Sequence, residues 1–287
     1  MITCCGIAYS DDVTSGVKTK VGTFADDIKD SNAIRSHDDC VDLQGDLDRI
    51  AGWAKETKML LNANKCQVLR MGWRPGKLAY PYQIDGSRLK EVSAQRDLGV
   101  LFSANGKRGE HCAAIAAKAN QALGLLKRTL STRSPKVLVP AFKALVRPLL
   151  EYCSSVWSPY LKKDVKCIER VQRRFSRLFK GLQDLPYDQR LDWLGLETLE
   201  SRRQRFDLTL VFKLLNGLVD LDWKSLLSMR EDRFAAPRTL FLKRCRTELR
   251  RNCFGIRVVR AWNALPEEVR CAPTLTAFKN RLAQSKL

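Results

Sequence analysis

The chain has 287 residues, of which 45% are hydrophobic, and it carries 51 Lys and Arg against 31 Asp and Glu. This length and apolar content predict a folded protein with a sizeable core, in one large domain or two modest ones. No apolar run approaches the roughly 20 residues of a membrane span, and the N-terminus lacks the basic start of a signal peptide. We therefore expect an intracellular protein of the cytoplasm or nucleus, without a membrane partner.

The positive charge is confined to one part of the sequence. The first 100 residues hold 14 basic and 14 acidic side chains, whereas the rest hold 37 basic and 17 acidic ones. The basic part is also rich in Leu, Phe, Val and Trp, which argues against a disordered basic tail. Such a part predicts a polyanionic partner, most often nucleic acid; a generic basic surface is the alternative.

The cysteines predict free thiols. None of the ten forms a Cys-x-x-Cys pair, and the two histidines, His37 and His111, have no second ligand at zinc-finger spacing. We therefore expect no disulfide partner and no structural metal.

Residues 1–105 predict short strands around one helix. Lys20–Phe24 has the composition of a strand and leads into a turn at residues 25–27. Apolar residues at helical spacing predict a helix over residues 40–58. Further strands are predicted at 66–72, at 80–84 and 89–92 as a hairpin around Asp85-Gly86, and at 96–102.

After residue 108 the pattern is almost entirely helical, and the basic residues cluster on it. Helices are predicted at 113–130, 135–152, 164–180 and 200–218, with two short helices in 258–287 divided by Pro273. The helix 164–180 has one apolar face, and cations cover much of the rest: Lys166, Arg170, Arg173, Arg174, Arg177 and Lys180. Such a face can follow a phosphate backbone, although an ordinary amphipathic surface helix has the same pattern.

Three Arg at the start of the next helix also hint at an anionic partner. Arg202, Arg203 and Arg205 lie where positive charge opposes the helix dipole.

Three Asp-Asp pairs occur, at residues 11–12, 26–27 and 38–39. Most such pairs are solvated loop residues, but only Asp26-Asp27 directly follows a predicted strand. A hairpin turn there would present carboxylates to Mg²⁺, which takes oxygen ligands. Two such ions about 4 Å apart can clamp both oxygens of an in-line displacement.

The segments around and after this pair carry a resemblance. Phe24-Ala25-Asp26-Asp27 forms an aromatic-Ala-Asp-Asp box, and further segments follow in order. They are Leu61-Asn62-x-x-Lys65-Cys66, Arg96–Val100, Val146–Tyr152 with Trp157–Tyr160, Ile168–Phe175 and Leu196–Arg203. With these segments the chain resembles the C-terminal part of the reverse transcriptase of non-LTR (LINE, jockey-like) retrotransposons, truncated at its N-terminus.

The resemblance implies an α+β fold, with a small antiparallel palm remnant (a β-hairpin plus helix and strands) followed by a mainly α-helical thumb and C-terminal region. The implied domains are the end of the palm (1–105), a helical thumb-like region (106–220) and a basic helical extension (221–287). The implied reaction is RNA-templated nucleotidyl transfer with two Mg²⁺ ions. The implied partners are RNA and an RNA–DNA duplex.

The resemblance also implies roles for individual residues. Asp26 would bind metal, Asp27 would support it, and Lys65 would be a candidate general acid for the pyrophosphate leaving group. Together with the charge pattern, it predicts these nucleic-acid contacts: Arg170, Arg173, Arg174, Arg177, Lys180, Arg202 and Arg203.

The departures from the family limit what we expect of this chain. The family's metal site needs another carboxylate from an earlier palm strand, which would precede residue 1, and the fingers are missing too. We therefore predict weak Mg²⁺ binding and no catalysis by the chain alone. Two alternatives remain: a non-catalytic basic RNA/DNA-binding protein, and an unselected retroelement relic that does not fold stably.

Overall fold

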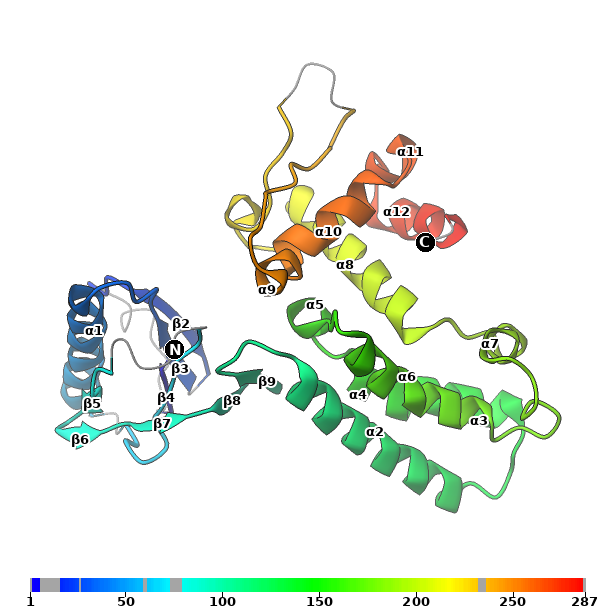
Figure 1. The fold of residues 1–287 in the computed structure, drawn as a ribbon, viewed down its shortest axis with the longest axis horizontal. Coiled ribbons are helices and arrows are strands. Elements are labelled where there is room, and N and C mark those ends of the chain that lie inside the picture. The colour runs from blue at the N-terminus through cyan, green and yellow to red at the C-terminus, as the bar shows by residue number, and fades with distance from the viewer. Residues whose placement is uncertain are drawn as a thin grey trace. The chain divides into compact units, whose positions relative to one another are not determined.

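The computed structural model describes residues 2–5, 16–25, 27–58, 61–72, 79–231 and 236–285. The chain divides into two compact units, Met1–Lys107 and Arg108–Leu287 (Figure 1). The first unit contains small sheets and one long helix, and the second is helical. The predicted α+β fold class is confirmed. A further division at residue 220 stays a prediction.

The largest sheet of the first unit has five strands in the order β2-β3-β1-β4-β7. They are β1 (Ile2–Cys5), β2 (Lys20–Phe24), β3 (Asp27–Ser31), β4 (Gln67–Leu69) and β7 (Lys90–Val92). All neighbours pair antiparallel except β4 and β7, which are parallel. The strand predicted at Lys20–Phe24 is therefore confirmed, and it forms an edge of the sheet.

Helix α1 (His37–Glu56) packs on this sheet, and its start is encoded locally. The Ser36 side chain accepts a hydrogen bond from the Asp39 backbone N–H, while the Asp39 carboxylate accepts from the N–H of Ser36. This capping box satisfies two backbone donors that the helix leaves unpaired. The helix begins three residues before the predicted range, because the cap lies at Ser36.

The structure has two smaller hairpins whose strands differ from the predicted ones. β5 (Gln83–Ile84) and β6 (Ser87–Arg88) pair around the predicted Asp85-Gly86 turn, whose residues both have positive φ. β7 does not belong to that hairpin, because it pairs with β4 instead. The single strand predicted at 96–102 is a second hairpin, β8 (Ala94–Asp97) and β9 (Val100–Ser103), which turns at Leu98-Gly99.

The second unit begins with a group of packed helices. They are α2 (Gly109–Thr129), α3 (Pro135–Ala141), α4 (Arg147–Glu151), α5 (Ser154–Trp157), α6 (Lys162–Ser176), α7 (Tyr187–Leu194) and α8 (Leu199–Leu215). The helix predicted at 135–152 contains a π-helical segment at Phe142–Val146. Pro148 follows that segment and has no N–H to donate to the preceding turn, which interrupts the regular hydrogen bonding.

Aromatic packing holds α6 with its apolar face inward. The Phe175 ring stacks on Phe142 at a centroid distance of 4.1 Å and meets Phe179 edge-on at 5.4 Å. The same face packs along α2, beside which α6 lies in Figure 1. Burying this face leaves the basic face of α6 toward solvent. The helix ends at Ser176, so Arg177 and Lys180 follow it rather than belong to it.

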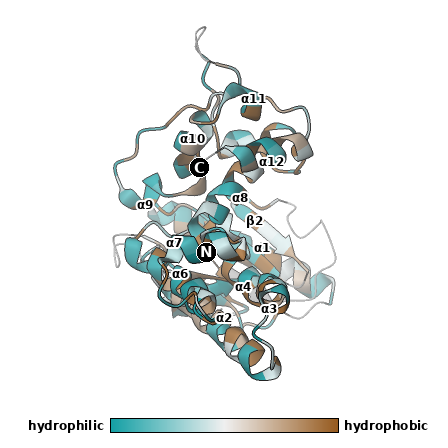
Figure 2. Ribbon diagram, turned by 90° about the vertical axis from the view of Figure 1, so that its right-hand side faces the viewer, coloured by the Kyte–Doolittle hydropathy of each residue, from teal (hydrophilic) through white to brown (hydrophobic). Residues whose placement is uncertain are grey.

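A separate core joins α8 to three C-terminal helices, α10 (Phe254–Asn263), α11 (Glu267–Arg270) and α12 (Leu275–Gln284). The short helix α9 (Glu248–Arg251) precedes them and has no buried residue. The Phe278 ring stacks on Phe212 at 4.4 Å and lies 5.9 Å from Trp262. Apolar and hydrophilic residues alternate at helical spacing along α10 and α12 (Figure 2). The structure thus has three helices in 254–284, α10, α11 and α12, where the sequence predicted two in 258–287.

Gly255, in the first turn of α10, has no room for a side chain. A Cβ at this position would lie 2.3 Å from the carbonyl oxygen of Leu226, which is backbone and cannot rotate away. We expect Gly255→Ala to lower the free energy of unfolding by about 2 kcal/mol, as overpacking does, in urea titrations. The control is Gly124→Ala in α2, where the nearest atom is the end of Arg128 at 3.5 Å. Equal stability of the two variants would contradict this prediction.

Candidate nucleic-acid interface

The acidic pair lies at the turn between β2 and β3. Phe24 pairs with Asp27 across the hairpin, and Ala25 between them has a φ of 50°. Left-handed backbone is what a two-residue hairpin turn of the favoured type requires. The predicted hairpin at this position is therefore confirmed, and Phe24 is 62% exposed beside its tip. Asp26, like Asp11 and Asp12, lies outside the described residues.

One carboxylate suited to Mg²⁺, which takes oxygen ligands, is described at this tip, that of Asp27. The residue that β1 places in register with Asp27 is Cys5. Among the described residues, no group of three or more His, Cys, Asp or Glu could hold a metal ion. Asp27 is thus the one predicted metal ligand that the structure describes.

Two acids that the sequence analysis did not select hold the hairpin in place. Asp46 of α1 is buried and accepts hydrogen bonds from the backbone N–H groups of Lys18 (3.0 Å) and Thr19 (2.8 Å). Asp30 of β3 is buried as well and accepts from the Thr19 hydroxyl. Burial raises the pKa of Asp30. The sequence signals the burial of Asp30 through the two-residue period of a strand, which puts Asp30 on the same face as Ile28.

Lys65 lies at the same end of the sheet as Asp27. It is exposed in the turn before β4, and β4 pairs with β1 so that Gln67 is level with Thr3. Because Thr3 is in turn level with Lys29, the residues before Gln67 lie toward the hairpin tip. One strand separates β4 from β3, so the two positions are roughly 10 Å apart. The structure therefore brings the predicted catalytic residues it describes, Asp27 and Lys65, to the same end of the sheet.

Five of the predicted nucleic-acid contacts form an exposed cationic face. Arg170, Arg173 and Arg174 lie on α6, and Arg177 and Lys180 directly follow it. Arg174 donates to the side-chain oxygen of Asn120 at 3.2 Å, and the guanidinium of Arg173 lies 3.9 Å from the centre of the Tyr187 ring. Within the described part of the chain, none of the five forms a salt bridge with a carboxylate.

Glu169, the acid nearest to this face in the sequence of α6, points into the protein. Its carboxylate accepts hydrogen bonds from the Tyr187 hydroxyl, the Leu199 N–H (3.1 and 3.2 Å) and the Gln172 amide (3.5 Å). Burial raises the pKa of Glu169 and also that of Tyr187. Because its charge is used internally, Glu169 does not neutralise the exposed cations.

Arg190 of α7 is a buried cation close to this exposed face, and sequence analysis did not select it. Its side chain is only 2% exposed, and its Nε and Nη1 atoms have no acceptor among the described residues. The guanidinium lies 5.6 Å from the centre of the Tyr187 ring, which Arg173 also covers. Burial, and then the charges of Arg177 and Arg173, lower the pKa of Arg190.

The structure corrects the prediction for the start of α8. Arg202 donates two hydrogen bonds to the Glu151 carboxylate, and Arg205 donates to Glu197 at 2.9 Å. Arg203 is 2% exposed, and burial lowers its pKa. Arg203 is therefore no surface contact, and the guanidinium of Arg202 is already paired. Internal carboxylates, rather than an external anion, compensate two of the three Arg at this helix start.

Two further findings concern partners. No helix in the described ranges is long and apolar enough to cross a membrane. The cysteines whose side chains are described are all free thiols: Cys40, Cys66, Cys112, Cys153, Cys167, Cys245, Cys253 and Cys271.

Fold and surface together define an α+β protein with a small sheet unit and a helical unit that bears a cationic face. No protein-family model, curated protein or solved structure matches the chain.

Proposed function

We propose that this chain is part of an RNA-directed DNA polymerase of a non-LTR retrotransposon and that its helical unit binds an RNA–DNA duplex. The observation that carries the binding proposal is the group of five exposed cations on and after α6, none of which forms a salt bridge with a carboxylate in the described structure. Phosphate groups complement such a face, and an RNA-containing duplex is recognised mainly through its backbone and shape. The hairpin with Asp27 and the position of Lys65 support the polymerase part.

Titration of the purified chain with a labelled RNA–DNA duplex tests the binding proposal. Each phosphate contact contributes about 0.9 to the slope of log affinity against log salt. If the five exposed cations each meet a phosphate, fluorescence anisotropy between 50 and 200 mM KCl should give a slope of roughly −4.5. Absence of binding at the lowest salt would overturn the proposal.

For the polymerase part, we expect no primer extension by this chain alone with Mg²⁺ and deoxynucleotides. The strand next to β3 in the sheet has the sequence Ile-Thr-Cys-Cys, so it brings no carboxylate beside Asp27. Extension assays on an RNA template should therefore give the same background for the chain and for its Asp26→Ala variant. Robust extension that Asp26→Ala abolishes would contradict this expectation.

The same purified chain distinguishes the polymerase proposal from its two alternatives. Duplex binding without extension is also the behaviour of a non-catalytic nucleic-acid-binding protein, and restored extension with a separately supplied upstream palm fragment would favour the polymerase. A cooperative thermal transition would argue against an unselected relic that does not fold stably.

A further inference from the structure

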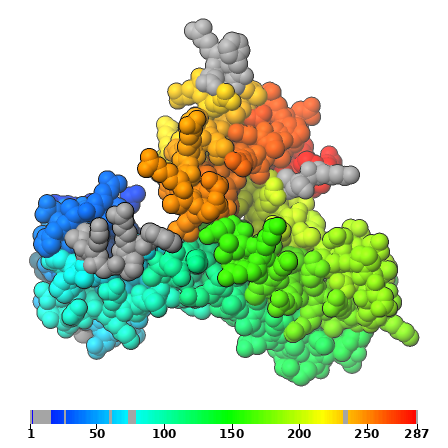
Figure 3. Space-filling view, in the orientation of Figure 1, coloured from blue at the N-terminus to red at the C-terminus, as the bar shows by residue number. Residues whose placement is uncertain are grey.

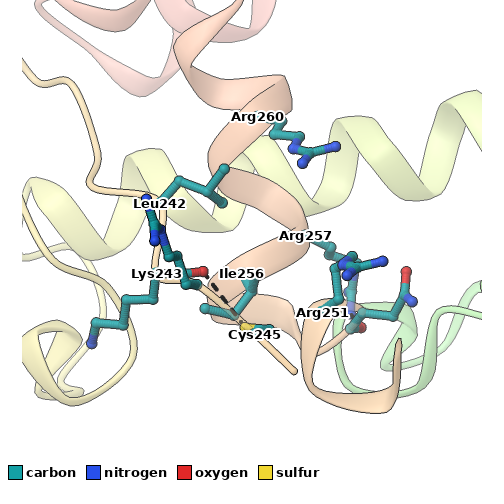
Figure 4. Close-up of a pocket in the computed structure, with 9 residues that line it drawn as sticks. Leu242, Lys243, Cys245, Arg251, Ile256, Arg257 and Arg260 are labelled. Atoms are coloured by element: carbon teal, nitrogen blue, oxygen red, sulfur yellow. Dashed lines mark hydrogen bonds between the residues drawn. The ribbon is translucent and has the colours of Figure 1, made fainter. Parts of the chain in front are cut away.

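A second cation-lined site lies between the segment 242–245 and helix α10 (Figure 4). It is a pocket of about 500 Å³, and its residues belong to the surface region around residue 250, orange in Figure 3. Five of its lining residues are cations, and none of those described is a carboxylate. The cations are Lys243, Arg244, Arg251, Arg257 and Arg260.

Two of these cations are fixed by bonds within the protein. Arg257 donates two hydrogen bonds to the Asp207 carboxylate, at 2.9 and 3.1 Å, and a third to the Ser155 carbonyl at 2.7 Å. Arg251 pairs with Glu248. These contacts make Arg257 a rigid part of the wall, with its charge balanced from behind.

The other three cations have no such partner. Lys243, Arg244 and Arg260 are exposed, and no acid in the described structure pairs with them. In Figure 4, Lys243 comes from the extended segment and Arg260 from α10. Cations that line a concave surface without acids create a positive potential, which concentrates anions.

The pocket also has apolar surface. Leu242 and the nearly buried Ile256 line it together with the cations. Its volume lies within the range of sites for small organic ligands. The groove beside α6, of about 440 Å³, differs because cations and acids line it together. They are Lys162, Lys166, Arg173, Glu169, Asp188 and Glu200. The described lining of the pocket at α10, unlike that of this groove, contains cations without carboxylates.

We propose that this pocket binds the phosphate groups of a nucleotide, with Lys243, Arg244 and Arg260 contacting the phosphates and Leu242 and Ile256 contacting the sugar or base. The nucleotide can be free or part of a single strand. Guanidinium groups suit this role because they form paired, charge-assisted hydrogen bonds to phosphate. This assignment does not depend on duplex binding at α6.

The test uses the full chain with two probes, ATP without metal and a single-stranded hexanucleotide, in isothermal titration calorimetry at low salt. We expect the double variant Arg244→Gln/Arg260→Gln to weaken binding of the recognised probe at least about tenfold. Arg128→Gln on α2, which removes another exposed Arg, should change it less than about twofold. Unchanged thermal unfolding of the double variant would show that its fold is retained.

The pattern of the two probes identifies the source of the phosphate. Binding of ATP alone indicates a free nucleotide, and binding of the hexanucleotide alone indicates a strand; either supports the proposal if the double variant loses it. Failure of both probes to bind overturns it. The proposal is also overturned if the double variant still binds the probe, whereas replacing Arg170, Arg174 and Arg177 of the α6 face abolishes probe binding. This holds even if duplex binding at that face is confirmed.

Discussion

Glu169→Ala is expected to lower the free energy of unfolding by about 3 kcal/mol, measured by urea titration. The substitution removes the buried acceptor shared by the Tyr187 hydroxyl and the Leu199 N–H. A buried donor left without an acceptor costs about 1–3 kcal/mol. Because Glu169 links α6, α7 and the start of α8, the loss should affect the whole helical unit.

Two variants control for this effect. Glu169→Gln keeps one acceptor oxygen and should retain more of the stability. Glu200→Ala removes an exposed acid in the first turn of α8 and should change the stability by less than about 0.5 kcal/mol. A loss in Glu200→Ala as large as in Glu169→Ala would contradict the role of the buried network.

The burial of Glu169 also predicts that the free energy of unfolding depends on pH. Burial raises the pKa of Glu169 above its ordinary value of 4.5, so the folded protein holds this proton more tightly than the unfolded chain does. Stability from this group is therefore full below pH 4.5 and declines as pH rises through the folded-state pKa. Glu169→Gln should remove that decline from the stability profile.

The triple variant Arg170→Gln/Arg174→Gln/Arg177→Gln is expected to weaken RNA–DNA duplex binding by roughly 10- to 100-fold at 100 mM salt. The slope of log affinity against log salt should become less negative by about 2–3, since three phosphate contacts are lost. Arg173 is left unchanged because it packs on the Tyr187 ring. Anisotropy titrations at several KCl concentrations measure both quantities.

A matched control distinguishes the contribution of the α6 face to duplex binding from that of the total charge of the protein. Lys58, Arg88 and Lys90 are exposed cations of the first unit, and replacing all three by Gln changes the total charge equally. That variant should bind the duplex within about threefold of the wild type. Equal losses in the two triple variants would show that the α6 face has no special part in binding.

The sequence by itself determined the elements whose information is local. The edge strand β2, the turn after Phe24 and the inward face of α6 follow from residue period and turn chemistry. The capping residues Ser36 and Asp39 likewise determine where α1 starts. Each of these depends on residues a few positions apart, so a single sequence contains the whole signal.

Only the tertiary structure decided which partners these elements find. β7 pairs with β4 rather than with the preceding hairpin, and Glu151, 51 residues from Arg202, removes that cation from the predicted interface. The buried Arg190 lies close to Arg173 and Arg177 because α7 packs against α6. Charge pattern in a sequence shows how many cations there are. Whether each one is paired, buried or free depends on distant residues that folding brings to it.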